Sequence, residues 1–417
     1  MYIGHRKFQQ LSVGYIIAWM IAPPLAYDMI YRLLAIGAAV LWLAIQILFE
    51  NNIIKNKNGE MAKALSIYMW CAVIYSISLI LFDIIFKKYS FGNAFYNNIT
   101  TFIFLFIGYI GGIYCEEQRY DELKKLFIFL VLLVILFSIT SIMRSEEFYV
   151  MTRSAGGEIS DEYNALARSA ARHGVGGFGF FAFCGAFAPL LFWCSYTYKG
   201  YKKAGMILAF VIVEVGVFSA GYTLALLISF TGIALTVFFK VKSPVMKLIF
   251  FLVGVFLILM WDDFVTVLYD FFQRIANGTM YANKVEDIFS FLIGGNSTGS
   301  FESRQERYLL SLKSIFRYPV FGSYILNDTN SIGHHSSILD VYAAYGWGIG
   351  FAWTYIIVLF PQKMAEIFYD KKYSKVVMAV LFFTALFNRT TMMMGIFFVV
   401  VPAISYIEKI NSRKTKM

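Results

Sequence analysis

Charged residues are scarce in this chain of 417 residues: they make up 15% of it, whereas hydrophobic residues make up 59%. Soluble domains are about one quarter charged, so this composition excludes an ordinary soluble domain. Apolar runs long enough to cross about 30 Å of hydrocarbon as a helix recur along the whole sequence. We therefore predict an all-α, polytopic membrane protein with about twelve transmembrane helices, forming a single transmembrane domain over residues 1–417. The expected spans are 10–27, 29–49, 65–86, 98–115, 126–143, 174–196, 204–219, 221–239, 245–262, 336–360, 375–388 and 393–408.

Cysteine is also rare. The four cysteines fall within or at the end of predicted spans, which favours a packing role over an extracytoplasmic disulfide framework. GxSxG and Walker motifs are absent, which removes two common signals of hydrolase and nucleotide-binding chemistry. No cleavable signal peptide is predicted, because the first apolar run lacks a small-residue cleavage site and further spans follow it.

Acidic residues are outnumbered, and the net charge is +10. With the N-terminus inside, 22 of the 36 Lys and Arg residues fall in the short connections on one side of the membrane. This distribution follows the positive-inside rule and marks that side as cytoplasmic. The basic charge is thereby explained by topology, so we expect no nucleic-acid partner.

Arginine is nearly missing from the cytoplasmic side, where 19 of the cations are Lys and 3 are Arg. The outer side has 4 Lys and 10 Arg. Lysine is adequate for topology, whereas the planar guanidinium of arginine can bind phosphate with two hydrogen bonds. The outer face is therefore predicted to bind an anion.

Two connections on the outer side are long, residues 144–173 and 263–335. The first ends in "YNALARSAARHG", a short predicted helix with Arg168 and Arg172 on one face. The second contains "FESRQERYLLSLKSIFRYPVFGS", whose apolar spacing predicts an amphipathic helix along the membrane surface, ended by Pro319. Arg304 lies in its first turn and Arg307 one turn later.

Half of the four histidines stand together, His334 and His335, immediately before an apolar run. Ser336 to Leu339 are expected to form the first turn of the tenth span. Histidine suits general base catalysis near neutral pH, and arginines can stabilise charge on a phosphate leaving group. The outer loops hold no Asp-x-Asp pair and no close set of oxygen ligands, so neither a metal nor another cofactor is expected. This combination indicates transfer from a phosphate-activated donor to a hydroxyl.

The segment "ESRQERYLLSLKSIFRYPVFGS" resembles a pattern of Wzy-type O-antigen or capsule polymerases and O-antigen ligases. In that pattern a Gly-Arg pair is followed by an amphipathic helix and a Pro-(Leu/Phe)-Phe-Gly sequence; here Ser303 stands in place of the glycine. "HSSILDVYAAYGWGIG" is similar to the His-Asn-x-x-Leu block of the same superfamily, with the spacing from His335 to Leu339 and Gly346 kept. The resemblance covers about 50 residues, from Glu302 to Gly350, and implies a GT-C-like fold.

The resemblance implies a glycosyltransferase of the bacterial inner membrane, with its active site facing the periplasm. Such an enzyme transfers a growing glycan, with inversion and without metal, from its undecaprenyl diphosphate carrier to a sugar hydroxyl. Its partners would be the lipid-linked oligosaccharide, membrane lipids and a chain-length regulator protein.

The resemblance also implies roles for individual residues. His335 would activate the acceptor, and Arg304 would hold the diphosphate. The arginine at the end of the earlier loop would be Arg172 or Arg168. The remaining predicted substrate-binding residues are Arg307, His334, Tyr308 and Arg317.

Two other functions stay open at this point. An O-antigen ligase would transfer the glycan to lipid A core. A flippase for lipid-linked oligosaccharides would need ionisable groups inside its spans, for which Glu214 is the main candidate.

Overall fold

The computed structural model describes the chain except for residues 1, 27, 51–58, 145–160, 221, 278–285, 287–299, 327, 369–370, 389–390 and 415–417. Much of the two long outer connections therefore falls among the residues that the structure does not describe. Within the described part, every regular element is a helix, which confirms the predicted all-α class.

Each expected span contains a helix. In chain order these are α1 (Tyr2–Ile21), α3 (Met29–Ile45), α4 (Glu60–Ile85), α6 (Ile99–Glu116), α7 (Tyr120–Met143), α10 (Phe178–Ser195), α11 (Gly200–Ala220), α12 (Thr223–Lys240), α13 (Pro244–Leu259), α17 (Leu339–Thr354), α19 (Lys371–Phe387) and α21 (Phe397–Lys414). Seven candidate membrane spans among the described residues are long and apolar enough to cross a bilayer. The count of twelve spans stays a prediction.

Shorter elements connect or extend these helices. They are α2 (Pro23–Ala26), a π-helical segment Gln46–Glu50 after α3, α5 (Phe91–Asn97), α9 (Asp161–Arg172), α14 (Trp261–Ala276), α16 (Ser300–Arg317), 3-10 turns Ser323–Leu326 and Thr329–Ser331, a π-helical segment Tyr355–Leu359 that leads into α18 (Phe360–Phe368), and α20 (Thr391–Met394). Helices α9 and α16 were expected from the sequence. Helix α14 was not, and it occupies the start of the stretch predicted as the second long loop.

Serine and proline set the start of α13. The Ser243 hydroxyl accepts a hydrogen bond from the backbone N–H of Met246 at 3.4 Å. Pro244 follows at the first helical position, where its missing N–H has no intrahelical acceptor to lose. At its other end, α13 stops where the backbone of Met260 leaves the helical conformation. The predicted span 245–262 is divided there into α13 and α14.

Helix α10 forms the centre of the bundle and packs against α11 and α12. Most of its aromatic side chains, among them Phe183 and Trp193, are almost fully buried. Gly185 permits the close approach of α12, because an added Cβ there would lie 2.4 Å from the carbonyl oxygen of Ala225. Large apolar side chains such as Trp70 and Leu132 are exposed on the outer helices, which is expected for a surface that faces lipid and unusual for one that faces water.

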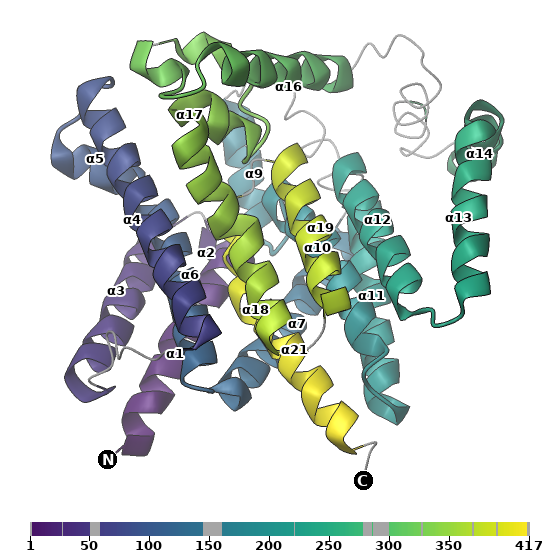
Figure 1. Cartoon of the computed structure of the whole chain (residues 1–417), viewed down its shortest axis with the longest axis horizontal. Coiled ribbons are helices and arrows are strands. Elements are labelled where there is room, and N and C mark those ends of the chain that lie inside the picture. Colours follow the sequence, from purple (N-terminus) through teal and green to yellow (C-terminus); the bar gives the residue numbers. More distant parts are fainter. Residues whose placement is uncertain are drawn as a thin grey trace.

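The two termini lie at one end of the bundle, and α16 lies across the opposite end (Figure 1). Helix α16 packs against α17, which in turn packs against α4. Ser311 and Ser314 of α16 are buried against the bundle, whereas Leu309, Leu312 and Phe316 are exposed. An exposed apolar face of this kind suits a helix that lies along a membrane surface, as the sequence predicted. This arrangement brings the two sequence blocks that carry the family resemblance to the same end of the molecule.

Candidate functional site

Two glycines hold α16 and the segment after it against α17. Gly322 has a φ of +72°, and an added Cβ there would lie 2.1 Å from the carbonyl oxygen of Ala344. Gly346 has a φ of +81°, and its added Cβ would lie 2.2 Å from the carbonyl oxygen of Val320. Glycine alone combines a left-handed backbone with such close backbone contact. The two positions that fix the motif spacing are thus the points where the two blocks touch.

Ser311 fixes the middle of α16 to the start of α17. Its hydroxyl donates to Oδ1 of Asp340 at 2.7 Å and accepts from the backbone N–H of Gly333 at 2.8 Å. A Cβ added to Gly333 would lie 2.0 Å from the carbonyl oxygen of Arg307. The chain that leads to His335 therefore passes directly over α16.

Ser336 caps α17. Its hydroxyl accepts from the backbone N–H of Leu339 at 3.0 Å, and its own N–H donates to Oδ2 of Asp340 at 2.9 Å. This reciprocal pair satisfies two donors at the helix start, in the manner of a capping box. The prediction that Ser336 to Leu339 form the first turn is wrong, because the helix begins at Leu339. His335 consequently lies just before the positive end of the α17 dipole.

Arg307 and His335 are brought into direct contact. Nη1 of Arg307 lies 3.0 Å from Nε2 of His335. A guanidinium can only donate hydrogen bonds, so Nε2 is the acceptor and the proton of the neutral ring is on Nδ1. In the part of the chain that the structure describes, no carboxylate forms an ion pair with Arg307. The partner of this guanidinium is thus a neutral base.

The arginines of α9 lie elsewhere. Nη2 of Arg172 is 3.9 Å from Oδ1 of Asp28, and both side chains are exposed. Arg168 is also exposed, and α9 packs against α2. Helix α9 lies at the same end of the bundle as α16 but farther from the viewer in Figure 1. The predicted donor-binding role of Arg172 therefore remains a prediction, because Arg172 does not contact His335.

Tyr308 and Arg317 have structural partners on or near α16. The Tyr308 hydroxyl donates to the carbonyl oxygen of Phe387 at 2.8 Å and so anchors α16 to the end of α19. The Arg317 guanidinium lies 5.2 Å from the ring centroid of Tyr318. Neither contact tests the predicted binding of substrate.

His334 and Arg304 complete the predicted set. His334 is exposed and has a positive φ of 60°, so the loop turns sharply directly before His335. Arg304 lies in the first turn of α16, three residues before Arg307, but its side chain is outside the described residues. The two positions are three residues apart on α16, which is about one helical turn.

Asn388 is a polar residue beside the site that the sequence analysis missed. Its side chain is buried, and among the described residues neither its side-chain nitrogen nor its side-chain oxygen has a hydrogen-bond partner. The backbone carbonyl oxygen of Asn388 accepts hydrogen bonds from the backbone N–H of Ser337 at 3.1 Å and from the Ser337 hydroxyl at 2.8 Å. A lone asparagine after an apolar run gives no signal that could have identified it.

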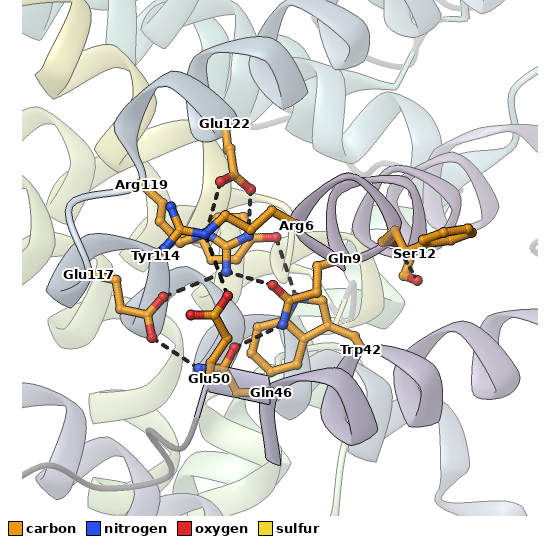
Figure 2. A network of polar contacts seen from close by, with 11 residues as sticks. Arg6, Gln9, Ser12, Trp42, Gln46, Glu50, Tyr114, Glu117, Arg119 and Glu122 are labelled. Carbon is orange, nitrogen blue, oxygen red and sulfur yellow. Dashed lines mark hydrogen bonds and ion pairs between the residues drawn. The ribbon is translucent and has the colours of Figure 1, made fainter. Parts of the chain in front are cut away.

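A second polar cluster lies at the end of the bundle that carries the termini, between α1, α3, α6 and α7 (Figure 2). Arg119 is at its centre, with a side chain only 2% exposed. Its guanidinium donates to both carboxylate oxygens of Glu122, at 3.0 and 2.6 Å, and to the side-chain oxygen of Gln9 at 2.8 Å. A carboxylate oxygen of Glu117 lies 3.6 Å away.

Gln46 extends this cluster to α3. It accepts from Gln9 at 2.9 Å and donates to Glu117 at 3.0 Å. Burial by itself would lower the pKa of Arg119, but Tyr114, Glu122 and Glu117 outweigh it and raise the pKa, so the guanidinium stays charged. The sequence held a signal for this cluster, because Arg119 is one of the few arginines on a side rich in lysine.

Among the described residues, no group of three or more His, Cys, Asp or Glu side chains could hold a metal ion. No protein-family model matches the chain, and no curated protein matches it in sequence. The junction of α16 and α17, together with the residues that carry the resemblance, is therefore the basis for proposing a function.

Proposed function

We propose that this protein is a Wzy-type polysaccharide polymerase of the bacterial inner membrane. It transfers a growing glycan from undecaprenyl diphosphate to a sugar hydroxyl of a lipid-linked repeat unit. The observation that carries the proposal is the 3.0 Å contact between Arg307 and His335. A base beside a guanidinium that has no carboxylate partner among the described residues suits transfer away from a phosphate leaving group.

The proposed chemistry is a single displacement at the anomeric carbon. His335 accepts the proton of the acceptor hydroxyl while the hydroxyl oxygen attacks, and the bond from the anomeric carbon to the diphosphate oxygen breaks. Undecaprenyl diphosphate leaves with the electron pair, and the configuration inverts. Arg307 and Arg304, one turn apart on α16, stabilise the developing charge on the diphosphate.

The orientation of the site follows from the positive-inside rule. The lysine-rich connections and the termini lie on the cytoplasmic side in this proposal, and α16 lies at the opposite end of the bundle (Figure 1). The junction of α16 and α17 then faces the periplasm at the outer leaflet. That is the place where a lipid-linked glycan and a growing chain can meet.

A ligase would use the same donor and the same residues but a different acceptor. Purified protein in lipid nanodiscs, supplied with a lipid-linked repeat unit alone, distinguishes the two. A polymerase lengthens that substrate, whereas a ligase needs added lipid A core. The absence of polymer combined with transfer to lipid A core would overturn the proposal in favour of the ligase.

The first prediction concerns the two adjacent histidines. General base catalysis contributes about 10²- to 10⁴-fold, so His335→Ala should lower the rate of polymerisation by that factor. His334→Ala is the comparison variant, because His334 has the same side chain one residue earlier, and it should lower the rate less than His335→Ala does. Polymer length is measured on gels at equal protein amount. Long polymer from His335→Ala would exclude it as the base.

A further inference from the structure

We propose that Arg307 is a substrate-operated gate on His335. The guanidinium of Arg307 engages the lone pair of Nε2 of His335, the atom that must accept the proton of the acceptor hydroxyl. The diphosphate of the donor then draws the guanidinium away and uncovers the base. This inference rests on the proposed function and adds to it an order of events, in which the donor binds before the acceptor is activated.

The first step is the chemical identity of the contact. Nη1 of Arg307 is 3.0 Å from Nε2 of His335, which is a hydrogen-bond distance. Because arginine has no acceptor, the hydrogen bond uses the Nε2 lone pair. While its Nε2 lone pair is engaged in this way, His335 cannot accept the proton of the acceptor hydroxyl. The Arg307 guanidinium must move away first.

The second step is the weakness of the partner. In the described part of the chain, Arg307 has no ion pair with a carboxylate, whereas Arg119 and Arg172 both do. Hydrogen bonds between a guanidinium and a phosphate are charge-assisted and about twice as strong as bonds to neutral acceptors. A diphosphate therefore competes well with a neutral imidazole for Arg307.

The third step is mobility of the side chain against a fixed backbone. The backbone of α16 is held by the contacts of Ser311 with Asp340 and Gly333, and by the Tyr308 hydroxyl bond to Phe387. The Arg307 side chain is itself exposed, so it can change rotamer while the helix stays in place. The gate thus needs no movement of the bundle.

The experiment uses the small number of histidines in the chain, four in all. The full-length protein is labelled with 15N-histidine in nanodiscs, and the Nε2 resonance of His335 is assigned from its loss in His335→Gln. We expect Arg307→Ala to shift this resonance. Addition of undecaprenyl diphosphate to the wild type should produce a shift in the same direction. Arg317→Ala, which removes another arginine of the same helix, is the matched control and should leave the resonance unchanged.

Two results would overturn the gate. An unchanged Nε2 resonance in Arg307→Ala would mean that the lone pair is not engaged by Arg307. A shift in Arg307→Ala combined with no response of the wild type to undecaprenyl diphosphate would mean that the donor does not move the guanidinium. Neither result depends on polymer formation, so failure of the gate is distinguishable from failure of the proposed function, which the nanodisc polymerisation assay tests separately.

Discussion

Replacing Arg119 with methionine should destabilise the protein strongly. The side chain of Arg119 is 2% exposed, and the partner carboxylates of Glu117 and Glu122 are 10% and 16% exposed. Methionine fills much of the volume but leaves both largely enclosed acids without their cation. Removing one partner of a buried ion pair costs about 3 to 5 kcal/mol, because the remaining charge is left uncompensated. At about 1.4 kcal/mol per factor of ten, this raises the unfolded fraction by about 10²- to 4 × 10³-fold.

Arg6 provides the matched control at the same end of the bundle. Its guanidinium lies 3.5 Å from Glu50; the Arg6 side chain is 46% exposed, whereas the Glu50 side chain is 6% exposed. Solvent screens the half-exposed Arg6 guanidinium, so this pair contributes less than a pair whose cation is fully buried, and Arg6→Met should cost less than Arg119→Met. The contrast between the two variants separates the effect of burial from the effect of losing any arginine on this side.

The assay is the thermal midpoint of the purified protein in detergent, followed by size-exclusion chromatography after heating. Arg119→Met should lower the midpoint far more than Arg6→Met. Adding Glu122→Gln to Arg119→Met should recover part of the loss, because it removes one of the uncompensated charges. Equal midpoints for Arg119→Met and Arg6→Met would refute the conclusion that the buried cluster holds α1, α3, α6 and α7 together.

Two further predictions concern packing and topology. Gly333→Ala should separate α16 from the His335 loop and strongly reduce activity, because the new Cβ would lie 2.0 Å from a backbone oxygen. Gly348→Ala is the control and should be neutral, because no atom lies within 4 Å of its new Cβ. Loss of activity in both variants, measured as polymer length, would contradict this reasoning. A cysteine introduced at exposed Asn93 should be labelled by an impermeant maleimide in intact cells, whereas one introduced at exposed Lys202 should not. The wild type gives the background labelling. The reverse pattern would invert the proposed orientation.

Local sequence determined much of the helical framework. Apolar runs placed a helix in each expected span, because a long uncharged run in lipid must satisfy its own backbone hydrogen bonds. The apolar spacing before Pro319 predicted α16, and the structure has that helix at Ser300–Arg317. The sequence did not predict α14. Its residues follow an expected span, and we therefore assigned most of them to the second long connection.

The tertiary structure decided which cation meets His335. The sequence favoured Arg304 and Arg172 through the resemblance, and it placed Arg307 among the substrate-binding residues. The contact of Arg307 with His335 joins residues 28 positions apart and depends on the register in which α16 packs on α17. That register is set by backbone contacts at Gly322, Gly333 and Gly346, and close approach of two backbones is a property of packing that no local pattern encodes.

The same limit applies to the cluster around Arg119. The sequence showed that arginine is rare on the lysine-rich side, but Arg119 and its partner Gln9 are 110 residues apart. Burial of a charge is decided by which helices pack around it, and those neighbours come from α1, α3 and α6. The sequence by itself therefore determined the helices and the distribution of charge between the two sides, whereas the packing of the helices determined which charges are buried, paired or available to a substrate.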